Sequence, residues 1–297
     1  MSNAAAAKTQ SRKKSKKNSQ LKEVWRRFRK NKSAMVGLVI LLIFALAAIF
    51  ADLIVPYERA IEQNGSVRLQ GPSSEHWFGT DAFGRDTFAR IIHGSRVSLS
   101  IGFAAVGISL IIGGFLGAAA GYYGGRTDNI IMRIMDVFTC VPGILLALAI
   151  VAALGSSMTN LLIAITIANI PGFVRLVRSS ILTVVENDFI EAARSYGAKD
   201  FRIIVKYILP NAMGPIIVQA TMGIAGMILS ASGLSYMGMG IQPPRPEWGA
   251  MLSEAKDYMR TAPYLLLFPG FAILISALCF NLVGDGLRDA LDPKLKD

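Results

Sequence analysis

Long uncharged stretches constrain the fold of this chain more than any other feature. Residues 97–125 contain no Asp, Glu, Lys or Arg over 29 positions, and residues 137–174 and 207–244 form two uncharged runs of 38 residues each. A helix of about 20 apolar residues crosses the hydrocarbon core of a bilayer. Hydrophobic residues make up 53% of the chain and charged residues 17%, and the mean hydropathy is +0.46. The sequence therefore predicts an integral membrane protein.

The breaks in the apolar runs predict six transmembrane helices. Residues 155–157, Gly-Ser-Ser, divide the run 137–174 into two spans, and polar segments separate the others. The spans are expected at 34–55, 97–125, 131–154, 161–177, 211–237 and 264–283. Gly113 and Gly117 allow close helix approach, so we expect them to pack against a neighbouring span. The predicted class is an all-α membrane protein with both termini on one side.

The distribution of positive charge predicts that both termini are cytoplasmic. Twelve of the 31 Lys and Arg residues lie between Lys8 and Lys32, and with the N-terminus inside, 23 fall on the inner side and 8 in outer loops. Beside a membrane span, this basic tail is an orientation signal rather than a nucleic-acid-binding arm. The composition of residues 1–18 is typical of disorder. We expect a basic cytoplasmic tail (1–32), a first transmembrane helix with an extracytoplasmic loop (33–96), a core of five spans carrying cytoplasmic helices at 186–209 (97–284), and a cytoplasmic C-terminal tail (285–297).

The chain lacks the residue patterns of an enzyme. It contains no Gly-Lys dipeptide and therefore no P-loop for a nucleotide, and its two histidines, His76 and His93, stand 17 residues apart without metal-ligand spacing. The few ionisable residues near the spans include Arg133 and Asp136, which we expect to pair on one helix face. Cys140 and Cys279 both lie in apolar runs and are expected to be buried. If the chain transports a solute, its energy must come from another chain.

Residues 186–211 form a charged interval between apolar runs and predict two short helices. Asp188 is placed as an N-cap with Glu191 at capping-box spacing, and Gly197 is placed to end the first helix in a left-handed conformation. Asp200 is expected to cap a second helix reaching Leu209, which Pro210 separates from the next span. The side chains that share one face of the first helix are those of Phe189, Ile190, Ala192, Ala193 and Tyr196. This face fits either lipid headgroups or a cytoplasmic partner.

The same interval resembles a family motif. Glu191-Ala192-Ala193, then Gly197, then Leu209-Pro210 is similar to the EAA motif of ABC importer permeases, with Tyr207 where the family has Ile. The resemblance implies a type I ABC importer permease fold, in which this loop is a coupling helix seated on an ATPase subunit. It assigns ATPase coupling to Phe189, Glu191, Ala192, Ala193, Tyr196, Gly197, Leu209 and Pro210.

Three further stretches resemble the C-type permease subunit of dipeptide and oligopeptide importers: residues 78–81 with 84–86, residues 240–244 with 248–249, and residues 284–293. This resemblance implies a bacterial plasma-membrane subunit with no catalytic, metal or cofactor site of its own. Its implied partners are a second homologous permease, two ATPase subunits that bind ATP and Mg²⁺, an extracytoplasmic binding protein and a peptide substrate. Nickel chelates or glutathione are the alternative cargoes. A membrane scaffold or receptor subunit is the alternative from another class.

The outer loops supply the remaining candidate residues, as contacts for substrate or binding protein: Asp81, Arg85, Asp86, Pro243, Pro244 and Trp248. Local chemistry gives several of them simpler roles. Asp81 is expected to form a turn, Asp86 to cap a helix, and Trp248 to lie at headgroup level. Phe88, Ile91 and Ile92 are expected to form an interfacial face.

Overall fold

The computed structural model describes residues 22–292, so the predictions for residues 1–21 and 293–297 lie outside it. The described chain is helical and has no strand. After a helical segment at residues 22–28, its α-helices are α2 (Lys32–Ile49), α3 (Ala51–Ile54), α4 (Glu58–Ile61), α5 (Thr87–Tyr123), α6 (Gly125–Thr139), α7 (Gly143–Leu154), α8 (Met158–Val185), α9 (Asp188–Ser195), α10 (Asp200–Ile203), α11 (Leu209–Tyr236), α12 (Trp248–Ala255) and α13 (Tyr264–Leu291).

Five helices of the described chain are long and apolar enough to cross a membrane, and the third predicted span is the exception. There, α6 and α7 are bent by 78° at a short break. Pro142 causes the break because it has no N–H for the helical ladder and restricts the residue before it. Counting this bent pair as one span gives six. The predicted all-α membrane class is therefore confirmed, although the third span is a broken helix.

Several spans extend beyond the limits that hydropathy predicts. Helix α5 begins at Thr87, ten residues before the predicted start, and its N-terminal residues are held by protein rather than lipid. Helix α13 continues to Leu291, so the boundary placed at residue 284 is not the end of an element. The first span is interrupted at Phe50, where α2 gives way to α3. Hydropathy locates the apolar part of a helix, whereas caps and packing set its ends.

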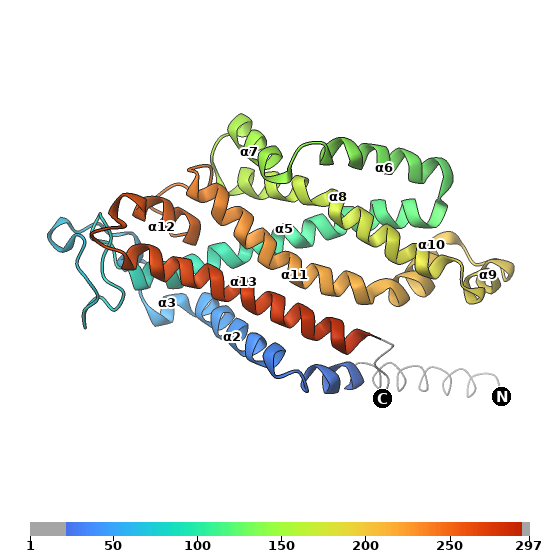
Figure 1. Cartoon of the computed structure of the whole chain (residues 1–297), viewed down its shortest axis with the longest axis horizontal. Coiled ribbons are helices and arrows are strands. Elements are labelled where there is room, and N and C mark those ends of the chain that lie inside the picture. The colour runs from blue at the N-terminus through green and yellow to red at the C-terminus, as the bar shows by residue number, and fades with distance from the viewer. Residues whose placement is uncertain (1–21, 293–297) are drawn as a thin grey trace.

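Glycines bring α5 and α8 together, as the sequence predicts. A Cβ added to Gly113 would lie 2.6 Å from the Cβ of Phe173, and one added to Gly117 would lie 2.6 Å from the Val174 carbonyl. These distances leave no room for a side chain, so the two backbones are in direct contact. Helix α5 is one rod of 37 residues that runs the length of the bundle (Figure 1).

The prediction that Pro210 separates a short helix from the next span is wrong. Residues 200–236 form one helix, which passes through a π-helical turn at Ile204–Ile208. In that turn the Leu209 N–H donates to the Ile204 carbonyl. Proline has no N–H to donate and its ring crowds the preceding turn of an α-helix. The wider π turn tolerates both effects, so the helix continues through Pro210.

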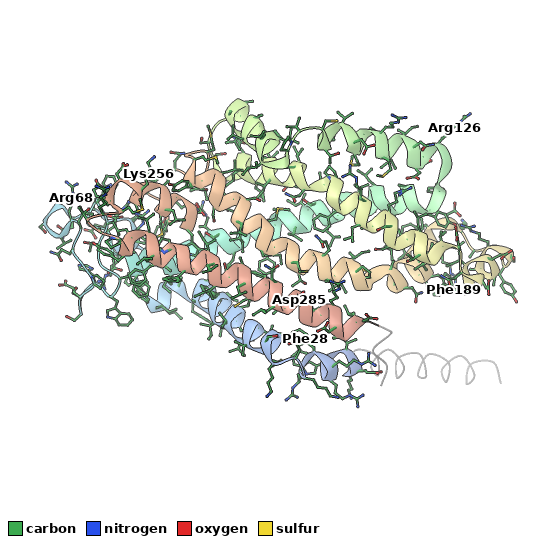
Figure 2. The ribbon with its side chains drawn as sticks, in the orientation of Figure 1. Phe28, Arg68, Arg126, Phe189, Lys256 and Asp285 are labelled. Carbon is green, nitrogen blue, oxygen red and sulfur yellow. The ribbon has the colours of Figure 1, made fainter. Side chains whose placement is uncertain are left out.

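The two ends of the bundle differ in what they carry (Figure 1). Helices α9 and α10 lie at one end, here called the elbow end. The connection at 56–86 and helix α12 lie at the other, the loop end. Figure 2 shows Arg68 and Lys256 at the loop end and Phe189 at the elbow end. The described chain ends lie side by side, because the Arg27 guanidinium donates to the Asp292 carbonyl at 3.4 Å.

Two smaller predictions from the sequence are wrong. Cys140 is exposed, since it lies in the break between α6 and α7, whereas Cys279 is buried as expected. Asp136 pairs with Arg175 of α8 at 3.0 Å instead of with Arg133, because the packing of α6 against α8 offers a closer partner.

Candidate functional site

The turn between α9 and α10 is a helix termination that requires glycine. Gly197 has φ +72°, its N–H donates to the Arg194 carbonyl at 2.8 Å, and the next N–H, of Ala198, donates to the Ala193 carbonyl at 3.1 Å. These two bonds form a Schellman motif. A Cβ at Gly197 would meet no atom within 4 Å, so only the backbone conformation demands glycine here.

The predicted apolar face of α9 divides into a buried part and an exposed part. Ile190 is fully buried in a cluster with Ile181 and Ile203, and Ala193 packs against it. The side chains of Phe189 and Tyr196 are 44% and 92% exposed. Ala192 is also exposed. The structure therefore places some of the predicted face against the bundle and leaves its aromatic members uncovered.

The aromatic surface continues onto α10, where Phe201 is 75% exposed. The sequence motif does not include this residue, although its large side chain in a charged interval is a usable signal. We call Phe189, Tyr196 and Phe201 the elbow surface. Exposed aromatic side chains of this kind are typical of residues that anchor a protein interface.

The predicted capping of α9 is wrong. Asn187 occupies the N-cap position, and no side chain of the described residues makes a capping bond there. Asp188 and Glu191 lie in the first turn, where their negative charges interact favourably with the positive end of the helix dipole. The Asn187 amide instead donates to the Val184 carbonyl at 2.9 Å and so satisfies the end of α8. Asn187 therefore joins α8 to α9.

Helix α5 also holds the elbow, a connection that the sequence did not reveal. The Tyr122 hydroxyl donates to the Asp200 carboxylate at 2.8 Å, and the Arg194 guanidinium lies 5.1 Å from the centre of the Tyr122 ring. Asp200, predicted as a helix cap, thus bonds to a neighbouring helix instead. Farther on, Leu209 begins α11 half-buried and Pro210 is exposed.

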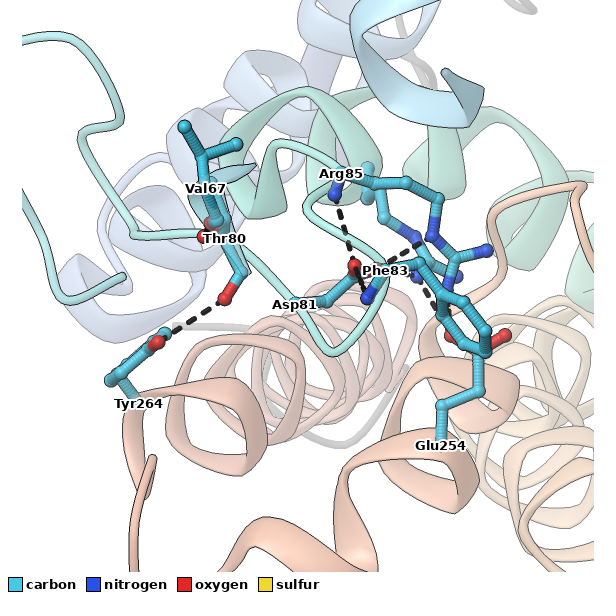
Figure 3. Close-up of polar contacts among 8 residues, drawn as sticks. Val67, Thr80, Asp81, Phe83, Arg85, Glu254 and Tyr264 are labelled. Atoms are coloured by element: carbon cyan, nitrogen blue, oxygen red, sulfur yellow. Dashed lines mark hydrogen bonds and ion pairs between the residues drawn. The ribbon is translucent and has the colours of Figure 1, made fainter. Parts of the chain in front are cut away.

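Two arginines and two carboxylates, Arg85, Arg90, Asp81 and Glu254, form a largely buried cluster at the loop end. Figure 3 labels Asp81, Arg85 and Glu254. Arg85 is 1% exposed; its Nε lies 2.7 Å from Asp81 Oδ2 and its Nη2 lies 2.6 Å from Glu254 Oε2. Arg90 is 2% exposed and contacts the same two carboxylates. The four charges cancel, and they join the connection at 56–86 and the start of α5 to α12.

Asp81 forms the predicted turn and also holds this cluster together. Its Oδ1 accepts from the N–H groups of Phe83 at 2.8 Å and Arg85 at 3.0 Å. Burial opposes ionisation of the carboxyl, but Arg90 and Arg85 beside it bring the net pKa of Asp81 below its ordinary value. Asp81 therefore stays charged inside the protein.

Asp86 caps α5 as predicted. Its Oδ1 accepts from the Ala89 N–H at 2.9 Å, while Oδ2 contacts His76 Nδ1 at 2.9 Å and Arg59 at 3.0 Å. The predicted interfacial face behind it is wrong in part. Ile91 is buried in the core, and Phe88 packs on Trp77. The first turns of α5 are thus covered by the loop.

The prediction that Trp248 lies at headgroup level is wrong, since it is fully buried. Its Nε1 donates to the Ile91 carbonyl at 3.1 Å. The preceding Glu247 caps α12 by accepting from the N–H groups of Gly249 and Ala250, both at 2.8 Å. Burial raises the pKa of the Glu247 carboxyl. The indole and the carboxyl together fix α12 against α5.

Among the candidate loop residues, only Pro243 and Pro244 expose their side chains to solvent. The peptide bond between them is cis. Asp81, Arg85, Asp86 and Trp248 are all buried, so in this structure they hold the loop end together and offer no surface to a soluble molecule. Residues 22–292 contain no group of three side chains suited to bind a metal ion.

Comparisons with known proteins agree with this architecture. Residues 113–297 match the family described as "Binding-protein-dependent transport system inner membrane component", and residues 19–72 match "N-terminal TM domain of oligopeptide transport permease C". The chain is 54% identical over 275 residues to the dipeptide transport system permease protein DppC of Alkalihalophilus pseudofirmus, covering 93% of this chain and 90% of the relative. It is 48% identical over 276 residues to the glutathione transport system permease protein GsiD of Pectobacterium atrosepticum, covering 93% and 91%.

A solved structure supports the fold. The chain resembles the MetNI methionine ABC transporter in an inward-facing conformation, with a TM-score of 0.58 and 18% identity over 69% of this chain and 97% of that one. At this identity the likeness concerns the fold alone, and it confirms the type I ABC importer permease fold.

Proposed function

The chain belongs to the binding-protein-dependent transport system inner membrane components, as a multi-pass permease of the dipeptide and glutathione type, and we propose that it couples ATP hydrolysis in partner subunits to the import of a peptide. The elbow surface is the observation that carries this proposal. Tyr196 and Phe201 expose most of their aromatic side chains at the end of the bundle, and Phe189 beside them is 44% exposed.

We assign the elbow to the cytoplasmic side, which places both termini there and the loop end outside. The excess of Lys and Arg in the segments on the elbow side supports this orientation. The elbow then faces the ATPase subunits, which bind ATP and Mg²⁺. The chain itself breaks no bond of the substrate and needs no cofactor, so it is not an enzyme.

The proposed mechanism is alternating access. The α9 helix is joined to α8 by Asn187, and its Arg194 lies over the ring of Tyr122 in α5. Helix α10 accepts the Tyr122 hydrogen bond through Asp200 and continues through the π turn into α11. Movement of the elbow by the ATPase pair is therefore transmitted directly to three spans. These spans reorient around a cavity shared with a second, homologous permease, and an extracytoplasmic binding protein delivers the cargo at the loop end.

Short peptides are the cargo that we propose, and glutathione, itself a tripeptide, is the second candidate. The relatives that are 54% and 48% identical carry the names of dipeptide and glutathione permeases, respectively. A nickel chelate is the third candidate, and neither of these two relatives is named for it. In all three cases we expect the binding protein to select the cargo.

Reconstitution tests the proposal. The chain, its partner permease, both ATPase subunits and the binding protein are placed in proteoliposomes, and ATP hydrolysis is measured with and without dipeptides or glutathione. We expect hydrolysis to rise with the binding protein and one of these cargoes, and labelled cargo to accumulate. A non-transporting scaffold or receptor subunit would give no cargo-stimulated hydrolysis and no accumulation.

A further inference from the structure

The segment that precedes the first span is docked in a fixed position on α13. Phe28, in the helical segment at 22–28, is 3% exposed, and a Cβ at Gly286 of α13 would lie 3.0 Å from its ring. The Asn31 amide donates to the Asp289 carboxylate at 3.1 Å. Figure 2 shows Phe28 close to the end of α13 that carries Asp285. The side chains of this segment therefore have defined directions.

The outward face of the same segment carries a patch of unpaired positive charge. The patch consists of exposed cations with no hydrogen-bond or ion-pair partner among the described residues: Lys22, Arg26, Arg29, Lys30 and Lys32. Glu23, the one acidic residue within the described part of this segment, pairs with Arg27 at 2.7 Å, and Asp289 of α13 accepts from Asn31. Five positive charges thus face away from the protein without compensation.

The patch lies where the span enters the membrane. Lys32 is the first residue of α2, whose 18 residues have a mean hydropathy of 2.4. Beside the cations, the Trp25 ring is 50% exposed and stacks on Phe28 with 5.8 Å between ring centroids. An indole at the border between an apolar and a charged surface is typical of the headgroup region of a bilayer.

We propose that this patch binds the headgroups of anionic phospholipids in the leaflet from which α2 enters the membrane. Lys and Arg side chains next to a span are attracted to the negative surface of a leaflet that contains anionic lipids. The phosphodiester groups match the five cations in charge, and the acyl chains lie against the first turns of α2. Bound lipid fixes α2 beside α13. This inference does not depend on the cargo or on ATP coupling.

Lipids with brominated acyl chains test the proposal, because bromine quenches the fluorescence of a nearby indole. The complete complex is reconstituted in nanodiscs of phosphatidylcholine with a fixed fraction of phosphatidylglycerol, and either lipid is brominated in turn. The difference between wild type and Trp25→Phe isolates the Trp25 signal from the other tryptophans. We expect Trp25 to be quenched at least two-fold more by brominated phosphatidylglycerol than by an equal fraction of brominated phosphatidylcholine.

The variant with all five patch cations changed to Gln should lose this preference. A matched control changes four exposed cations of the loop end to Gln, at Arg68, Arg245, Lys256 and Arg260, and should keep it. Equal quenching by both lipids in wild type, or a preference that survives neutralisation of the patch, would overturn the proposal.

Discussion

The loop end and the elbow end of this permease reverse the usual placement of charged and apolar side chains. At the loop end, Arg85 and Arg90 are almost fully buried and paired with carboxylates. At the elbow end, Tyr196 and Phe201 are largely exposed. A buried cluster of balanced charges is complete within the chain, whereas an exposed aromatic surface needs another molecule to cover it.

This difference separates residues that hold the fold from residues that meet a partner. The loop end is held by ionic contacts between the connection at 56–86, α5 and α12. The elbow contacts the bundle through the apolar side chain of Ile190 and through neutral hydrogen-bonding groups of Asn187 and Tyr122. Substitutions at the loop end should therefore affect mainly stability. Substitutions at the elbow should affect mainly assembly and coupling.

The largest effect is expected for Arg90→Ala. This variant leaves the buried Asp81 and the largely buried Glu254 with one cation fewer, and removal of one member of a buried ionic cluster costs about 3–5 kcal/mol. The apparent free energy of unfolding of the purified chain in detergent measures the loss. As a control, Arg96→Ala breaks an ion pair with Asp52 whose side chains are 43% and 63% exposed, together with hydrogen bonds to the carbonyls of Ala48 and Ile49. It should cost only about 1–2 kcal/mol, because no charge is left buried without its partner. Equal losses in the two variants would contradict the proposed role of the buried cluster.

The elbow surface should show the opposite behaviour. Replacing Tyr196 and Phe201 together by Ala removes two exposed aromatic groups, so the unfolding free energy should change little. Loss of interface anchors should weaken binding of the ATPase subunits by about 2 kcal/mol, roughly thirty-fold. Affinity of the permease pair for the ATPase subunits measures this, with Phe83→Ala, an aromatic residue 45% exposed at the loop end, as control. Unchanged affinity would exclude this surface as the docking site.

A pH dependence of stability is expected from Glu247 at the loop end. Because burial raises the pKa of Glu247 above its ordinary 4.5, the native state keeps a proton that the unfolded chain releases as the pH rises between the two values. In that window the stability of the wild type falls with rising pH, by no more than about 1.4 kcal/mol per unit. Glu247→Gln removes this titration. The stability of the wild type relative to this variant should therefore decrease as the pH rises from 4.5, and a constant or increasing difference would contradict the account.

The smallest effect concerns the link between the elbow and α5. Tyr122→Phe keeps the ring beside Arg194 but removes the hydrogen bond to Asp200, a loss of about 1 kcal/mol. We expect about five-fold less cargo imported per ATP hydrolysed, with assembly unchanged. Tyr123→Phe is the matched control, because its neighbouring ring is 57% exposed and its hydroxyl makes no hydrogen bond within the described residues. Equal transport ratios for the two variants would show that this bond does not serve coupling.

The sequence predicts those features that depend on local chemistry. The apolar spans follow from hydropathy, and the helix end at Gly197 follows from the preference of glycine for the left-handed conformation. The cap at Asp86 and the close helix packing at Gly117 follow from residue type. The EAA motif located the elbow correctly, although it did not indicate which of its side chains are exposed.

Features that depend on tertiary contacts were not predictable in the same way. From the sequence, Trp248 is expected at headgroup level, but α12 packs on α5 and buries it. Asp200 has the spacing of a cap, but the Tyr122 hydroxyl lies closer. Pro210 breaks most helices, yet a π turn accommodates it. In each case a partner that is distant in the sequence, or an unusual backbone turn, overrides the local preference.

The uptake supported by Gly197→Val tests the central claim most directly. Valine strains the left-handed turn at φ +72° without meeting any atom, so the chain should insert and assemble while the elbow loses its geometry. The control, Gly238→Val, places the same strain at φ +83°, also in open space, after the loop-end terminus of α11. In proteoliposomes we expect Gly197→Val to hydrolyse ATP with uptake reduced at least ten-fold, while Gly238→Val transports normally. Normal uptake by Gly197→Val would contradict the assignment of the elbow as the coupling element.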